Sequence, residues 1–92
     1  MEMTARSVKI HNDFIEDVYL WVWDLNTVDR RVVLDGARIN AGTDQSISVE
    51  TDQDGYALVE WYARKTQDPN TDKRQENVKI DKHENLNIGP FW

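Results

Sequence analysis

The sequence contains no cysteine, so neither disulfide bonds nor thiolate-ligated metals can stabilise this 92-residue chain. It also lacks any run of 18 apolar residues, and we therefore expect no membrane-spanning helix. The first seven residues lack the apolar segment of a signal peptide. The default expectation is a cytoplasmic protein, and the alternative is a secreted one whose signal peptide has been removed.

Basic charge is scarce as well. The chain has 11 Lys and Arg residues against 17 Asp and Glu residues, which gives a net charge of −6. The acidic residues are spread through predicted turns, whereas a nucleic-acid partner needs clustered Lys and Arg. We therefore predict no nucleic-acid partner.

Residues suited to catalysis are also few. The chain has two histidines, His11 and His83, and its four glycines are scattered singly. No serine occupies a G-x-S-x-G turn. A small hydrolase would need a histidine to meet a carboxylate in a pocket. We expect instead a protein without enzymatic activity and without a cofactor.

What the sequence does have is a series of short alternating apolar runs. They predict strands at 7–11, 17–24, 31–34, 45–51, 56–64, 78–80 and 86–88, with the last two forming a hairpin. Asp35-Gly36 and Asp54-Gly55 are typical of tight hairpins or bulges, with 37–39 as the strand returning from the first. Residues 66–77 have no apolar side chain, which predicts a long, exposed and mobile loop. We predict one all-β domain over residues 1–92, a mainly antiparallel β-sandwich or small barrel of seven or eight short strands.

The segment 17–24 is apolar on both of its faces. Because successive strand residues point to opposite sides, Val18, Leu20 and Val22 line one face while Tyr19, Trp21 and Trp23 line the other. A two-layer domain buries only one side of such a strand. Segment 56–64 has the same two-sided character, and the candidate binding residues are Tyr19, Trp21, Trp23, Trp61 and Tyr62, with Trp92 as a further aromatic.

These aromatic residues support three interpretations. They could fill the core, form a surface for a protein partner or a second copy, or stack on a glycan. We favour mutual packing for most of them, with binding through whatever aromatic surface remains outside.

Two acidic loops are candidates for a Ca²⁺ site. The first holds Asp24, Asn26 and Asp29, and the second holds Asp52 and Asp54 before Gly55. The second loop is not an EF-hand, because position 12 counted from Glu50 is Trp61 and not the required glutamate. If both loops leave the same end of the sandwich, they could share a cation.

The stretch Thr51-Asp52-Gln53-Asp54-Gly55-Tyr56-Ala57 resembles the T-D-x-x-G-x-a turn of bacterial immunoglobulin-like and carboxypeptidase-regulatory-like sandwich domains. The resemblance covers about 20 residues around this hairpin. It implies an immunoglobulin-like or similar sandwich, and it implies a structural or adhesive accessory role within a larger protein. We expect these 92 residues to stand as a domain by themselves.

The expected function is therefore non-catalytic binding through an aromatic sheet face. The partner would be a protein or a second copy of the chain. A carbohydrate- or Ca²⁺-binding module is the alternative, and a small hydrolase is the second alternative.

Overall fold

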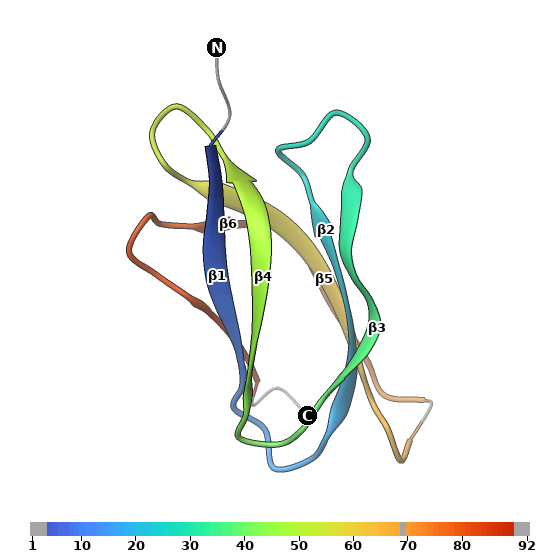
Figure 1. Cartoon of the computed structure of the whole chain (residues 1–92). Coiled ribbons are helices and arrows are strands. Elements are labelled where there is room, and N and C mark those ends of the chain that lie inside the picture. The colour runs from blue at the N-terminus through green and yellow to red at the C-terminus, as the bar shows by residue number, and fades with distance from the viewer. Residues whose placement is uncertain (1–3, 69, 90–92) are drawn as a thin grey trace.

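The computed structural model describes residues 4–68 and 70–89 (Figure 1). These residues form seven strands and no helix, and the strands are β1 Thr4–Asn12, β2 Val18–Asp24, β3 Arg31–Ile39, β4 Asp44–Thr51, β5 Ala57–Lys65, β6 Asp72–Ile80 and β7 Leu86–Ile88. The predicted all-β, mainly antiparallel, sandwich-like fold is confirmed. The described residues include no helix with the length and apolarity needed to cross a membrane.

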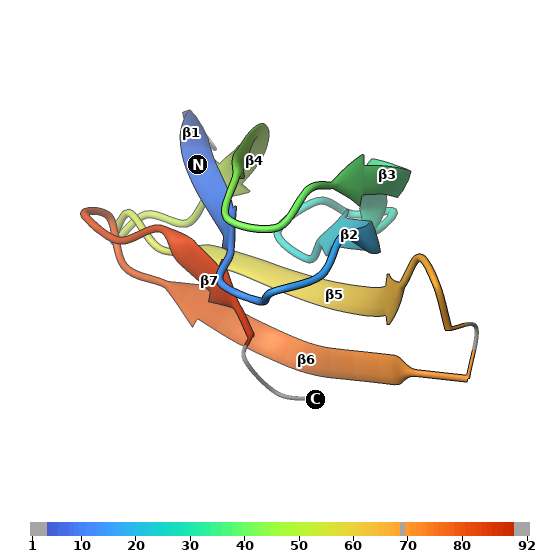
Figure 2. The same cartoon turned by 90° about the horizontal axis from the view of Figure 1, so that it is seen from below.

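Two groups of strands face each other across the interior. In one group β6, β5, β2 and β3 pair in that order, and in the other β4, β1 and β7 pair. The groups are joined where Thr51 on β4 lies opposite Ala57 on β5. Figure 2 shows β1 and β4 on one side of the molecule with β5 and β6 on the other. The sheet therefore curls round on itself without closing into a barrel.

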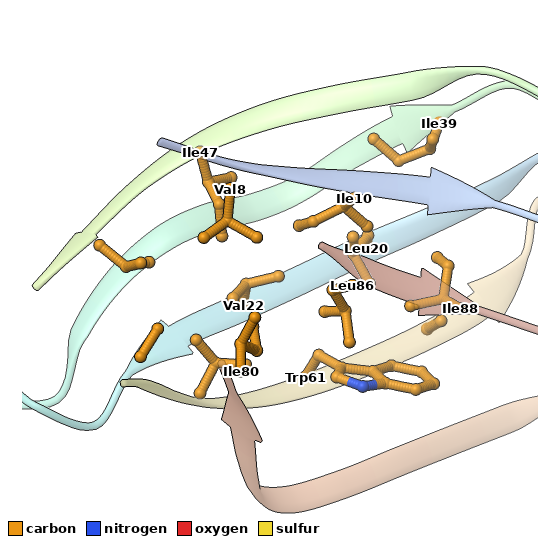
Figure 3. Close-up of a cluster of buried hydrophobic side chains, with 14 of the residues drawn as sticks. Val8, Ile10, Leu20, Val22, Ile39, Ile47, Trp61, Ile80, Leu86 and Ile88 are labelled. Atoms are coloured by element: carbon orange, nitrogen blue, oxygen red, sulfur yellow. The ribbon is translucent and has the colours of Figure 1, made fainter. Parts of the chain in front are cut away.

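The core takes alternate residues of β1, β2, β4, β5 and β7, together with Ile39 at the end of β3 and Ile80 at the end of β6. In β2 the side chains alternate between buried and half-buried, with Val18, Leu20 and Val22 completely buried. Leu20 and Val22 lie opposite Ala63 and Trp61 of β5 on the same side of the sheet. Figure 3 shows these side chains converging with those of β1 and β7. Apolar burial of this kind provides the main stabilising free energy of a domain without disulfides.

The prediction of a loop over residues 66–77 is wrong for its second half. Residues 72–77 belong to β6, which pairs with β5 along its length. Most of this strand is exposed, and its apolar residues Val78 and Ile80 lie at its end. An edge strand whose faces meet water needs no apolar alternation, and charged side chains are common on such edges. Hydrophobic periodicity therefore gave no signal for it.

Two further predictions need correction. Asp35-Gly36 does not make a hairpin, because β3 runs through it with a register shift opposite Leu20 and Trp21. Of the two structures predicted for Asp35-Gly36, a hairpin or a bulge, the chain forms the bulge, with Gly36 at φ 76°. In addition, β7 does not return along β6 but pairs in parallel with β1. Strand partners of this kind depend on the whole fold and not on local pattern.

Asn12 fixes the point where the chain crosses from one group of strands to the other. It is completely buried at the end of β1. Its amide Nδ2 donates to the carbonyl oxygens of Glu16 at 3.0 Å and Ile39 at 3.1 Å. Its Oδ1 accepts the backbone N–H of Phe14 at 3.0 Å. One side chain thus satisfies three backbone groups around this crossing.

We predict that Asn12→Ala lowers the free energy of unfolding by about 2–3 kcal/mol, because it leaves buried backbone groups without partners. Urea denaturation followed by far-ultraviolet circular dichroism measures the change. Asn87→Ala is the matched control, since Asn87 is exposed on β7, and it should change stability by no more than about 0.5 kcal/mol. Equal effects of the two substitutions would contradict the role given to Asn12.

Candidate functional site

The outer side of β2 and β5 carries a row of aromatic side chains. The antiparallel register places Trp21 opposite Tyr62 and Tyr19 opposite Arg64. Tyr19, Trp21, Trp23 and Tyr62 are each half-buried, and we call these four residues the aromatic face. The Trp21 and Tyr62 rings meet edge to face, with centroids 5.2 Å apart and planes inclined by 63°. Four of the five predicted binding residues therefore share one surface.

Trp61, the fifth predicted residue, does not lie on the aromatic face. It follows the opposite alternation of β5 and is 1 % exposed. Figure 3 shows its indole directed into the core, in the same cluster as Leu86 and Ile88. A neighbour of Tyr62 in sequence must point to the other side of the strand. Trp92 lies outside the described residues.

Arginine guanidinium groups cover the rings of the aromatic face. Arg64 on β5 lies over Tyr19 and Trp21, with Cζ 5.9 and 5.6 Å from the ring centroids. From β6, Arg74 lies 5.8 Å from the Trp23 ring and 5.7 Å from the Tyr62 ring. These distances are within the range of cation–π attraction. The face therefore alternates aromatic and cationic groups.

A buried carboxylate holds the arginines on either side of Trp23. Glu60 on β5 lies opposite Trp23 and is 7 % exposed. It forms ion pairs with Arg30 of the β2–β3 loop and with Arg74, whose Nε lies 3.4 Å from Oε2. Arg30 also lies over the Trp23 ring at 5.8 Å. Because an unpaired buried carboxylate is costly, Glu60 requires both cations to stay close.

The aromatic face is hollowed at its centre. Trp21, Trp23, Tyr62 and Arg74 line a shallow, open depression of about 230 Å³. The Tyr62 hydroxyl donates to Asp72 at 2.7 Å, which fixes that ring at one side. Such a depression can receive one side chain or one small ring from a ligand.

Arg64 differs from the other two arginines of the face. Among residues 4–68 and 70–89, its guanidinium has ring contacts but no hydrogen-bond or ion-pair partner. Asp72, its neighbour across the β5–β6 ladder, accepts the Tyr62 hydroxyl and does not pair with Arg64. The N–H donors of Arg64 are thus free to bind a group from outside.

Gly36 lets the Trp21 indole lie close to the backbone of β3. A Cβ atom on Gly36 would fall 3.1 Å from Cζ2 of the Trp21 indole. The positive φ of Gly36 also belongs to the left-handed region that side chains disfavour. The bulge in β3 therefore leaves the space that the Trp21 indole occupies on the aromatic face.

The five predicted cation ligands lie at one end of the molecule, at the end of β2 and in the β2–β3 and β4–β5 loops, and three of them bind backbone groups. Asp24 is completely buried, and its Oδ2 accepts the N–H of Glu50 at 2.8 Å. Asn26 Nδ2 donates to the carbonyl oxygens of Glu50 and Tyr56, at 2.9 and 3.1 Å. These bonds tie the two loops together directly, without an ion.

The remaining predicted ligands are one residue of a capped turn and two exposed carboxylates. Asp52 Oδ1 accepts the N–H groups of Asp54 and Tyr56 at 2.9 and 3.0 Å, as expected for a capped hairpin turn. Asp29 and Asp54 are exposed. Within the described part of the chain, no three His, Asp or Glu side chains form a group that could hold a metal ion. The shared Ca²⁺ site stays a prediction.

The histidines lie away from the aromatic face. His11 Nδ1 is 2.5 Å from Oδ1 of Asp44, its neighbour across the β1–β4 ladder, and both side chains are partly open to solvent. His83 is exposed in the loop between β6 and β7. Neither histidine lines the depression on the aromatic face.

Sequence reasoning missed Arg30, Glu60, Arg64 and Arg74. One signal was present, because Glu60 interrupts the outer alternation between Leu58 and Tyr62. An acidic residue in such a row needs a cation beside it. Arg74 had no signal, because residues 72–77 of β6 were predicted as a loop.

The chain matches no protein-family model, no curated protein and no solved structure. The likeness of the 51–57 turn to sandwich-domain hairpins remains a likeness of one turn. Function is therefore inferred from the geometry of the aromatic face.

We predict that Gly36→Ala destabilises the protein more than Gly42→Ala does. Both glycines have positive φ, 76° and 73°, so each alanine bears a backbone cost of about 1–2 kcal/mol. Only at Gly36 does the new methyl group meet another side chain, because a Cβ on Gly42 has nothing within 4 Å. Thermal unfolding and tryptophan emission measure the difference. Identical stability losses with unchanged emission would show that Trp21 does not depend on Gly36.

We predict a late phenol titration that belongs to Tyr62. Its hydrogen bond to Asp72, together with burial and the Asp72 charge, raises the pKa of Tyr62 above 10.0. The neutral phenol therefore stabilises the fold below the unfolded-state pKa, and this contribution disappears as pH rises through the folded-state pKa. Absorbance at the phenolate band should lose its highest-pH component in Tyr62→Phe and keep it in Tyr56→Phe. Asp72→Asn should move that component to lower pH, and an unmoved titration would argue against the hydrogen bond.

Proposed function

We propose that this protein is a non-catalytic interaction module that binds a protein partner through the aromatic face. The observation that carries this proposal is the half-buried aromatic row on β2 and β5, with an open depression of about 230 Å³ at its centre. Trp, Tyr and Arg are the residues that contribute most to binding at protein interfaces. The face combines all three on two central strands, which hold their positions more rigidly than a loop would.

The arginine cover favours a protein partner over a glycan. Sugar rings stack on open aromatic faces, but Trp23 has guanidinium groups of Arg30 and Arg74 near its ring, and Trp21 has that of Arg64. A protein segment can use the guanidinium donors and the apolar depression together. The same rings would therefore serve a mixed polar and apolar interface.

The two edges of the four-stranded group β6-β5-β2-β3 make strand addition beside the aromatic face a poor route to binding. The outer strand β3 is bulged at two places along β2. At the other edge, β6 carries exposed charged residues and has Asn77 at φ 56° beside a register shift. Bulges and charges on edge strands oppose pairing with another chain. A partner would therefore dock on the face and not extend the sheet.

A peptide-display selection on the full chain tests this function. Selected peptides are measured against Trp23→Thr, which removes one ring and keeps β-propensity, and against Lys9→Gln. Lys9 is exposed on β1 in the other group of strands. We expect peptides that keep their affinity for Lys9→Gln and lose at least about tenfold with Trp23→Thr. Trp21→Thr serves as a second variant, and circular dichroism confirms that each variant is folded. If every selected peptide binds the folded Trp variants as well as the wild type, the proposal is wrong.

A further inference from the structure

We infer that the aromatic face recognises an acidic peptide segment, in which a carboxylate binds Arg64 while a neighbouring apolar side chain enters the depression. This inference rests on the proposed function and specifies its partner. The depression and Arg64 are adjacent, because Trp21 lines the former and lies 5.6 Å beneath the guanidinium of the latter. One short segment can therefore reach both.

The bonding state of the three arginines identifies Arg64 as the recognition group. Arg30 and Arg74 share the Glu60 carboxylate, so their charge is partly compensated within the chain. Arg64 has no carboxylate within ion-pair distance among the described residues. It is nevertheless oriented, since its guanidinium lies over the rings of Tyr19 and Trp21. An oriented guanidinium with free donors is suited to bidentate binding of a carboxylate.

Charge complementarity sets this face apart from the protein as a whole. The chain has a net charge of −6, so an acidic ligand is repelled on average. Preference for acidic peptides would therefore have to come from local cations. In the row formed by Tyr19, Trp21, Trp23 and their β5 neighbours, Arg64 is the cation without an ion pair in the part of the chain that the structure describes.

The spacing of the two subsites limits the partner's sequence. An extended peptide advances about 3.3 Å per residue, and alternate side chains point to the same side. A carboxylate on Arg64 and an apolar side chain beside Trp21 are then about two residues apart. Acidic and apolar residues should thus recur at that separation in any segment that binds.

Two other occupants fit the face less well. Two copies placed face to face by a two-fold axis would bring Arg64 near the Arg64 of the other copy or its neighbouring cations, and like charges oppose such a contact. Nucleic acid requires several free cations along a phosphate backbone. Here two of the three arginines are already paired with Glu60.

The test examines the composition and arginine dependence of the peptides whose binding depends on Trp23. From a library without charge bias, we expect them to be enriched in Asp and Glu within two residues of an apolar residue. Arg64→Gln should weaken their binding about tenfold, as for loss of a charge-assisted hydrogen bond. Lys9→Gln, which makes the same change in net charge, should leave it unchanged. Arg64→Lys should restore part of the affinity, and added salt should weaken it.

The outcomes separate this inference from the proposed function. Peptides whose binding depends on Trp23 could show no enrichment in Asp and Glu, or could bind Arg64→Gln as tightly as the wild type. Either result would overturn the inference of an acidic partner and leave the proposed binding through the aromatic face intact. An absence of Trp23-dependent peptides would overturn both. If quenching of tryptophan emission showed that a 20-nucleotide oligothymidine binds more tightly than the selected peptides, the partner would be nucleic acid and the inference would be wrong. Sedimentation showing a dimer that Arg64→Gln strengthens would replace the peptide with a second copy.

Discussion

The pairing of β2 with β5 is the interaction on which the rest of this structure depends. A single register places Val22 beside Trp61 in the core and Trp21 beside Tyr62 on the outside. A slip by one residue would exchange the two faces of β2, sending indoles inward and small aliphatic side chains outward. The volume of the core and the shape of the aromatic face are therefore not independent. The register that packs the interior therefore also holds the outer rings at fixed positions.

Glu60 links the same strand pair to its surroundings. A carboxylate that is 7 % exposed on the outer side of the sheet would destabilise the fold if left alone. Its ion pairs draw in one arginine from the β2–β3 loop and one from β6, segments far apart in sequence. These arginines in turn cover Trp23. The free-energy cost of burying the Glu60 carboxylate is thus offset by two arginines, and these ion pairs hold both guanidinium groups near the Trp23 ring.

Sequence pattern predicted two kinds of strand: those with one face on the core and the other toward solvent, and those with apolar side chains on both faces. It located β2, β4 and β5 closely, because their apolar residues alternate against a core. It found residues 78–80 of β6 but missed residues 72–77, which are mostly exposed and are held by pairing with β5. Strand alternation places Trp61 and Tyr62 on opposite faces of segment 56–64. Both were nevertheless candidate binding residues, because both are aromatic. Sequence pattern also does not reveal that the polar atoms of Asp24 and Asn26 bind the backbone of residues 50 and 56.

The bulges of β3 and the charges of β6 affect how copies of the chain can assemble. With β3 bulged against β2 and β6 charged and distorted at Asn77, neither edge of the four-stranded group β6-β5-β2-β3 offers a flat template that another copy could extend. Strand addition from another copy is thereby opposed at both edges of the group that carries the aromatic face. In the complex that we propose, the partner would bind side chains of that face and leave the backbone groups of β3 and β6 unextended.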